Sequence, residues 1–353
     1  MPFLNSVSGT LGVIGTRKGI SQIVTNSLIL NLDASNQLSF GNRNFVSAKI
    51  YSVYNGGLRS SNYTVQYSDD GSTWTTAWTG VATNNSSCGL VQNTGSGNGS
   101  YGLRRYWRYV EGSAVVSHHP RVSRIILTDQ DGSDFDIVNY TSDNCSDSGT
   151  YIVGTVTYDS YQGWKDLSST STNARLLNGV TYSSSNQGYL AFDNVNDYAT
   201  VPSSSKFAFG TGDFTLETWI RPESFSNYLH MIALPEQNTF ALKAEVTSGL
   251  IYYYDSSYTT YGSTSGWALT LNAWNHVVFK RESSVGYAFL NGISKGSKSG
   301  FTSNFSAQIL NIHNGYGSEF ASCGISSVRI YNRALNSNEI SQNFNATRSK
   351  YAI

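Results

Sequence analysis

The sequence predicts an all-β fold of two antiparallel β-sandwiches of the jelly-roll type, one inserted into a loop of the other, behind an extended N-terminal arm. Three observations predict it. Short stretches alternate apolar and polar side chains with the period of two that strands require. Turn residues separate these stretches, and only one segment carries a full helix start. The length of 353 residues fits two domains.

Composition limits the kinds of partner. Charged residues make up 13% of the chain and the formal net charge is zero, so the field that attracts nucleic acid or an acidic membrane is missing. Tyrosine (24) and glycine (33) are abundant, which suits exterior β proteins. We expect no nucleic-acid binding, no membrane insertion and no cleaved secretion signal. Cys88, Cys145 and Cys323 lack CxxC spacing, so a zinc site is disfavoured. A single disulfide between two of them remains an open alternative.

The first half begins with an arm and continues as short strands. Residues 1–25 are rich in Gly, Ser and Thr and predict an extended arm. In residues 63–68 the alternation places Tyr63, Val65 and Tyr67 on one face of a half-buried strand. An Asp-Asp-Gly turn then predicts a hairpin. Strands are predicted at 27–33, 63–68, 73–78, 106–110 and 123–127.

The second half repeats this pattern and ends in a helix. Asn291 and Gly292 predict a tight type I′ hairpin. Asn336 is a suitable N-cap, with Glu339 as its capping-box partner. Strands are predicted at 189–193, 214–220, 250–254, 275–280, 287–290 and 326–331.

Four motifs in the second half carry a family resemblance. They are Phe192–Tyr198 with Phe214–Ile220, Trp274–Phe279, Phe289–Gly292 and Val328–Leu335. In this order they resemble the laminin-G-like, concanavalin A-like jelly-roll family. In that family the first strand commonly reads like Leu30–Ala34, followed soon by a segment like Trp164–Ser168, but here more than a hundred residues separate the two.

This separation implies an inserted domain. The resemblance divides the chain into an arm (1–25), a discontinuous laminin-G-like jelly roll (26–39 plus 160–353) and an inserted β-sandwich (40–159). Insertion at a surface loop is well tolerated because domain termini often lie close together. The insert resembles discoidin-type domains, the C domains of coagulation factors, through Tyr63–Trp74, Arg105–Tyr109 and Arg124–Leu127.

Two sets of residues are candidate sites. Glycan contact needs exposed rings, and the densest aromatic cluster comprises Tyr252, Tyr254, Tyr258, Tyr261 and Trp267; of the three consecutive tyrosines 252–254, at least one must face the core. The resemblance also implies calcium at a loop rim, where Asp193, Asn196 and Asp197 offer oxygens. Asx turns explain those three residues better, so no cofactor is required and calcium is optional.

Other polar residues have ordinary structural explanations. Asp131, Asp134 and Asp136 form a looser carboxylate set. Glu217 alternates with core aromatics, and His276 lies inside a strand motif, so both are interpreted as packed residues. No paired carboxylates or Gly-x-Ser-x-Gly motif stand out, and the chain is predicted not to be an enzyme.

The arrangement as a whole resembles virion proteins of bacterial viruses. It implies a structural, decoration, fibre or tail-associated protein on the virion surface, assembled in the host cytoplasm. The expected partners are other virion proteins through the N-terminal arm, further copies of the chain and host cell-surface glycan. A free-standing lectin-like module and a concanavalin A-like glycoside hydrolase or lyase are the alternatives.

Overall fold

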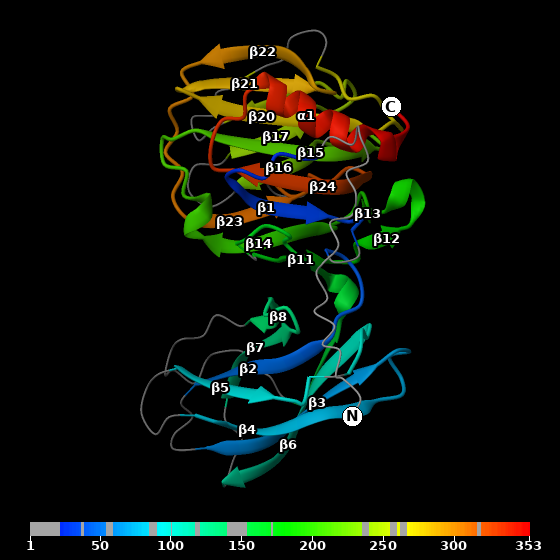
Figure 1. The fold of residues 1–353 in the computed structure, drawn as a ribbon, viewed down its shortest axis with the longest axis vertical. Helices are drawn as coiled ribbons and strands as arrows, with labels where there is room; N and C mark the ends of the chain where they lie inside the picture. The colour runs from blue at the N-terminus through cyan, green and yellow to red at the C-terminus, as the bar shows by residue number, and fades with distance from the viewer. Residues whose placement is uncertain are drawn as a thin grey trace, which may run out of the picture.

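The computed structural model is all-β and contains two β-sandwiches stacked along the long axis of the molecule (Figure 1). It describes residues 22–36, 39–53, 59–84, 90–99, 101–116, 121–139, 154–170, 172–234, 240–254, 260–261, 267–315 and 319–353. Every strand pair within these residues is antiparallel, as the fold class predicted. None of the described helices is long and apolar enough to cross a membrane.

The large sandwich contains two sheets, here called sheets I and II. In hydrogen-bonded order, sheet I consists of β12 (Thr181–Ser183), β13 (Tyr189–Phe192), β24 (Cys323–Tyr331), β15 (Phe214–Pro222), β20 (Asn275–Glu282), β21 (Val285–Leu290) and β22 (Ile293–Ser299), with β1 (Leu28–Asp33) also on β24. Sheet II consists of β10 (Gly163–Trp164), β11 (Ala174–Leu177), β14 (Tyr198–Ser204), β23 (Gln308–Ile312), β16 (Leu229–Leu234), β17 (Phe240–Ala244), β18 (Ile251–Tyr254) and β19 (Thr260–Tyr261).

The small sandwich contains sheets III and IV. Sheet III consists of β5 (Leu90–Ser96), β2 (Phe45–Val53), β7 (Arg121–Asp129) and β8 (Asp134–Asn139). Sheet IV consists of β4 (Thr75–Thr83), β3 (Ser60–Ser68), β6 (Tyr106–Val116) and β9 (Thr155–Asp159). Alternation buries Tyr63 and Val65 of β3 against Trp107 and Tyr109 of β6, which form one core with β2 and β7.

The strand β1 joins the beginning of the chain to its end. Leu30 lies opposite Ile330 and Leu32 opposite Val328, and both leucines are fully buried in the core of the large sandwich. Residues before and after the small sandwich therefore share one sheet. The predicted domain bounds at 39/40 and 159/160 and the discoidin resemblance of the insert stay predictions.

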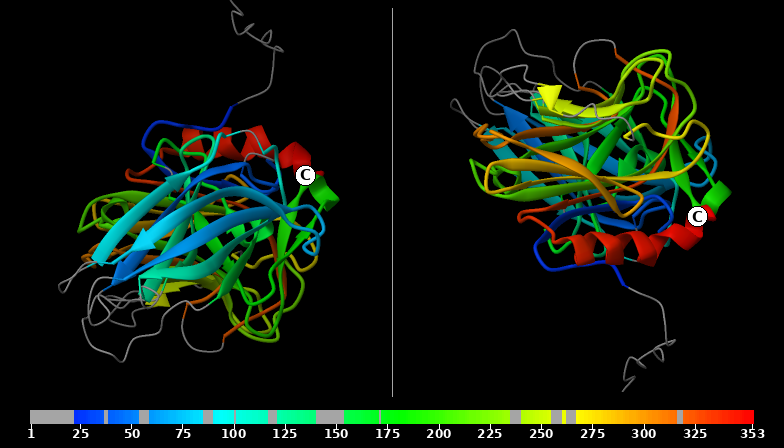
Figure 2. Two further views of the ribbon diagram at one scale, coloured as in Figure 1. Left: turned by 90° about the horizontal axis from the view of Figure 1, so that it is seen from below. Right: turned by 90° about the horizontal axis from the view of Figure 1, so that it is seen from above.

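Local expectations about turns and the helix are confirmed. Asn291 (φ 54°) and Gly292 (φ 76°) form the turn between β21 and β22. The helix α1 (Ser337–Thr347) begins at Asn336, and both bonds of its capping box to Glu339 are present. It lies on the outer face of sheet I beside β1 (Figure 2), where Trp219 Nε1 donates to Thr347 Oγ1 at 2.9 Å.

The end of the predicted arm contacts this helix. Val24 N donates to Asn343 Oδ1 at 2.7 Å, and the Tyr331 hydroxyl donates to Val24 O at 3.1 Å. Residues 1–21 of the arm lie outside the described residues. Four 3-10 turns complete the described structure, at η1 (Ser160–Gln162), η2 (Ser185–Gln187), η3 (Ser205–Phe207) and η4 (Arg348–Tyr351). Cys323 is buried and unpaired, whereas Cys88 and Cys145 lie outside the described part.

Candidate functional site

A buried ion pair fixes the two sandwiches against each other. Lys165 follows β10 of the large sandwich, and its Nζ lies 2.9 Å from Asp129 Oδ2 and 3.0 Å from Asp131 Oδ2. Asp129 ends β7 of the small sandwich, and its other oxygen accepts from the backbone N–H of Asp131 and Ser133. Because Lys165 and Asp129 are both buried, their attraction is only weakly screened by salt. The junction is therefore held in one geometry.

Close packing at Gly163 reinforces the junction. A Cβ at this position would meet the Tyr158 hydroxyl at 2.3 Å and the Phe135 ring at 2.9 Å. Asn173 of the large sandwich also donates from Nδ2 to Asp134 O of the small sandwich at 2.7 Å. Two clefts open at this preorganised junction, and both are bounded by residues of the two sandwiches.

The first cleft, here called the tyrosine cleft, has three aromatic rings in its wall. The Phe40 ring lies 4.9 Å from Tyr182 in a stacked arrangement and 5.1 Å from Tyr161. Phe40 is buried in the core, whereas Tyr182 is 40% exposed. The cleft encloses about 440 Å³ and is lined by Phe40, Arg105, Asp159, Tyr161, Gln162, Leu176, Asn178, Gly179, Val180, Thr181 and Tyr182.

One carboxylate positions both Tyr161 and Arg105. Asp159 caps the turn η1, where its Oδ1 accepts from Tyr161 N at 3.0 Å. Its Oδ2 lies 3.0 Å from Arg105 Nη2, and the guanidinium is stacked 4.6 Å from the centre of the Tyr161 ring. The hydrogen bond to Asp159 raises the pKa of Arg105. The cleft therefore has a fixed, charged hydrogen-bonding pair beside its rings.

A tight turn positions Tyr182. Asn178 (φ 67°) and Gly179 (φ 123°) follow β11 of sheet II, and the chain then enters β12 of sheet I. Both residues need the left-handed region that Asn and Gly tolerate. Asn178 Nδ2 donates to Asn196 O at 2.9 Å, which holds the turn. Sequence reasoning missed this site, although the Asn-Gly pair after an apolar run was a usable indication.

Part of the aromatic cluster predicted from the sequence is buried in the core of the large sandwich. Tyr253 and Trp267 are buried in the core, at 1% and 4% exposure. The expectation that one of residues 252–254 faces the core is thus confirmed at Tyr253, and Trp267 offers no exposed ring for stacking. The backbones of Tyr252 and Tyr254 lie in β18 and that of Tyr261 in β19, and Tyr258 lies outside the described residues. Glycan contact by these four tyrosines stays a prediction.

The predicted calcium residues form an Asx-type loop. Asp193 Oδ1 accepts from the backbone N–H of Val195, Asn196 and Asp197 at 2.9, 3.1 and 3.3 Å. Desolvation raises the pKa of Asp193, but these three bonds outweigh it and lower the pKa overall. In the described part of the chain no group of three His, Cys, Asp or Glu could hold a metal ion. Among the described residues, Asp197 Oδ1 is buried and has no hydrogen-bond partner. Calcium binding at this loop stays a prediction.

The looser carboxylate set does not converge on one point. Asp131 pairs with Lys165, Asp134 with Lys49 and Asp136 with Arg124. Each carboxylate therefore has its own cation from a different strand or loop. This arrangement suits structural ion pairs.

Glu217 and His276 are packed residues, as their strand positions predicted. Both are fully buried beneath α1, where Arg329 Nη1 donates to Glu217 Oε1 at 2.6 Å and His276 Nε2 lies 3.3 Å from the same oxygen. Asn343 of α1 donates to Glu217 Oε2 at 2.6 Å. This network ties the helix to sheet I.

A second polar cluster lies on sheet II away from the junction. Glu319 Oε2 contacts His230 Nε2 at 2.6 Å and Lys243 Nζ at 3.0 Å. Burial lowers the pKa of His230, and the His230 hydrogen bond lowers the pKa of Glu319. The carboxylate is thus shared between two buried partners, while Nδ1 of His230 is buried without a hydrogen-bond partner among the described residues.

Many solved structures are similar to part of this chain, and three of them show the range of proteins involved. The binding domain of Paraclostridial Mosquitocidal Protein 1 is 18% identical, with a TM-score of 0.44 over 51% of this chain and 49% of that one. Domain 4 of AbnA, a GH43 extracellular arabinanase from Geobacillus stearothermophilus, in complex with arabinotriose, is 13% identical, with a TM-score of 0.45 over 51% and 91%. The binding domain of Botulinum Neurotoxin DC, in complex with SialylT, is 13% identical, with a TM-score of 0.44 over 52% and 48%. The match thus spans about half the length of the two toxin domains.

One family model matches the second half of the chain. No curated protein matches the sequence. The tyrosine cleft is formed by residues that precede the matched segment in the chain, such as Arg105, Tyr161 and Tyr182. Residues 192–341, which run from the end of β13 into α1, are similar to the Concanavalin A-like lectin/glucanases superfamily.

Proposed function

We propose that this chain is a non-enzymatic carbohydrate-binding protein that holds its glycan in the tyrosine cleft. The family description matched by residues 192–341 names lectins and glucanases, which both take carbohydrate. A binding function is the simpler of the two, because it needs a shaped cleft and no reacting groups.

The observation that carries this proposal is the exposed Tyr182 ring beside Tyr161 and the Arg105–Asp159 pair. An aromatic face packs on the apolar C–H face of a sugar ring. The neighbouring guanidinium and carboxylate supply a donor and an acceptor for the ring hydroxyls. The cleft therefore offers an exposed ring next to hydrogen-bonding groups, an arrangement that suits a glycan.

The ionisable groups around the cleft favour binding over hydrolysis. Glycoside hydrolysis needs two carboxyl groups, one of them protonated. Among the described residues that line the tyrosine cleft, Asp159 is the only carboxylate, and it is held in an ion pair with Arg105. The lining therefore does not offer the pair of carboxyl groups that hydrolysis uses.

The test is glycan binding by the full chain with Tyr182 replaced. On a glycan array followed by calorimetry, Tyr182→Ala should weaken binding about tenfold, because the stacking face is removed. Tyr287→Ala is the matched control, since Tyr287 is a partly exposed residue of β21 and lines neither junction cleft. Equal affinity of Tyr182→Ala and the unaltered chain would contradict the site, and release of cleaved sugar would contradict the non-enzymatic role.

The virion-surface location, the homo-oligomer and the virion partners stay proposals that rest on the composition and the N-terminal arm. In a particle that displays many copies, weak glycan sites would act together. Mass spectrometry of purified particles tests this location, because a structural component is present in stoichiometric amount.

A further inference from the structure

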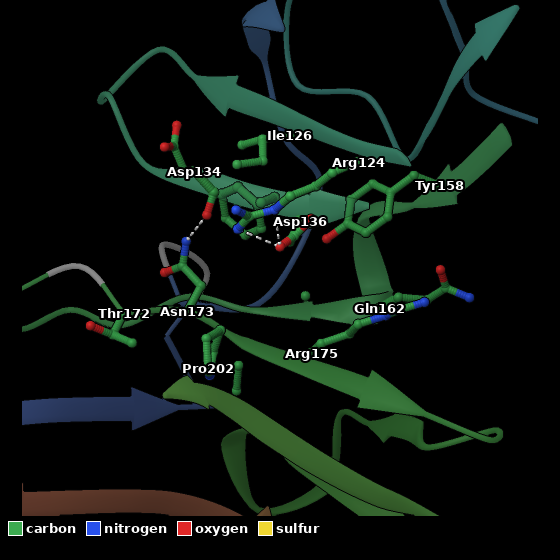
Figure 3. A pocket seen from close by; sticks show the side chains of 13 residues that line it. Arg124, Ile126, Asp134, Asp136, Tyr158, Gln162, Thr172, Asn173, Arg175 and Pro202 are labelled. Atoms are coloured by element: carbon green, nitrogen blue, oxygen red, sulfur yellow. Dashed lines mark hydrogen bonds and ion pairs between the residues drawn. The ribbon is translucent and has the colours of Figure 1, made fainter. Parts of the chain in front are cut away.

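The second junction cleft, here called the arginine cleft, lies between the edges of sheets II and III (Figure 3). It encloses about 190 Å³. Arg124, Asp136 and Tyr158 come from the small sandwich, and Asn173, Arg175 and Pro202 come from the large one. Both sandwiches are needed to form it, as they are for the tyrosine cleft.

The charged residues that line the arginine cleft are two arginines and two aspartates, and one of the arginines has no ion-pair partner in the described part of the chain. Arg124 Nη2 lies 2.7 Å from Asp136 Oδ2, and Asp134 is paired with Lys49. Arg175 is exposed, and among the described residues its side chain makes no ion pair or hydrogen bond. One guanidinium in the cleft therefore has its donors available for a ligand. A guanidinium binds carboxylate and sulfate oxygens through two parallel hydrogen bonds.

The surroundings of Arg175 are fixed before a ligand arrives. Its backbone pairs with Gly163 on one side and Thr200 on the other. Asn173, two residues earlier, is bonded across the junction to Asp134 O. Tyr158 directs its hydroxyl into the gap in Figure 3, and burial raises the pKa of this phenol, so it stays a donor. A ligand anion would meet Arg175 beside an uncharged donor.

The two clefts share one residue. Gln162 lines both of them, it ends the turn η1 that carries Tyr161, and its side chain is exposed. We infer that the tyrosine cleft and the arginine cleft are the two ends of one groove, which binds an oligosaccharide with a sugar ring at Tyr182 and an acidic sugar at Arg175. This inference rests on the proposed glycan-binding function and adds the class of ligand.

The test compares acidic glycans with their neutral partners on the full chain. The array carries sialylated and uronate-containing oligosaccharides with their desialylated or methyl-esterified forms, and sulfated oligosaccharides with their unsulfated forms. The unaltered chain should bind acidic members about tenfold more tightly than their partners at low salt, which matches one charge-assisted hydrogen bond. The preference should shrink as salt is raised, because the cleft is open to solvent.

Arg175→Gln should remove most of this preference without changing the thermal unfolding temperature. Arg348→Gln, which removes the same charge at an exposed position after α1, should keep the preference. Tyr182-dependent binding without a preference for acidic members would overturn the inference and leave the proposed function standing. Absence of binding to every glycan would overturn both. Comparison of the carboxylated with the sulfated oligosaccharides shows which anion binds to Arg175.

Discussion

At the scale of single residues, the charge of Glu217 in the core carries a high desolvation cost. Its side chain is fully buried, so desolvation alone would raise its pKa. Arg329, His276 and Asn343 outweigh desolvation and lower the pKa of Glu217 to about 2. Such a pair is costly to break, because removing one partner leaves the other charge buried without compensation.

Glu217→Gln should therefore lower the free energy of unfolding by about 3–5 kcal/mol at pH 7. The folded pKa is depressed below the ordinary value of 4.5, so the stabilisation is present above pH 4.5 and is lost as pH falls toward 2. The variant should lack this part of the acid dependence in urea unfolding measured across that range. Glu282→Gln is the control, because the Glu282 side chain is 47% exposed although it pairs with Lys280. A Gln variant as stable as the parent would refute the assigned network.

At the scale of elements, the short strand β10 determines how closely the sandwiches approach. Gly163 lies opposite Arg175 of β11 and against Tyr158 and Phe135 of the small sandwich. Its φ of −117° is open to any residue, so the requirement for glycine comes from space and not from the backbone. The next residue, Trp164, is fully buried in the large core. One strand thus serves the core and the junction together.

Gly163→Ala should destabilise the protein by about 1–3 kcal/mol, because its methyl group would overlap Tyr158 and Phe135. It should also weaken glycan binding, since both clefts depend on this approach. Thermal unfolding and calorimetry measure the two effects. Gly212→Ala is a milder comparison, because its Cβ would meet only Phe209 O at 3.1 Å. Wild-type stability in Gly163→Ala would argue against a tightly packed junction.

Sequence reasoning recovered the elements whose patterns are local. The alternation in β3 and β15, the Asn291-Gly292 turn and the capping box of α1 depend on neighbours in the chain. Strands such as β16 and β17 were not predicted, because their sequences are mostly apolar and show no alternation of apolar and polar residues.

The candidate site could not be predicted from local sequence patterns. Arg105, Tyr161 and Tyr182 meet only after two sandwiches have folded and docked, so no single stretch of sequence contains the cleft. The tyrosine run in β18 was predicted to bind glycan because its residues are adjacent in sequence. The structure places Tyr253 of this run in the core. The Asn178-Gly179 turn was the one local indication of the site.

At the scale of the whole molecule, the two sandwiches act as one body with a groove at their junction. β1 is the first strand and lies in sheet I, and the small sandwich follows it (Figure 1). β10 then returns the chain to sheet II. Lys165 with Asp129, and Asn173 with Asp134, hold the two parts in register. A preorganised groove loses less conformational entropy when it binds a ligand.

The most direct measurement is a crystal structure of the full chain bound to an oligosaccharide selected on the glycan array. We expect a sugar ring stacked on Tyr182, hydroxyls bonded to Arg105, Asp159 and Gln162, and the chain of sugars continuing toward Arg175. Sugar bound on another surface of either sandwich, with the junction clefts holding only water, would contradict this expectation.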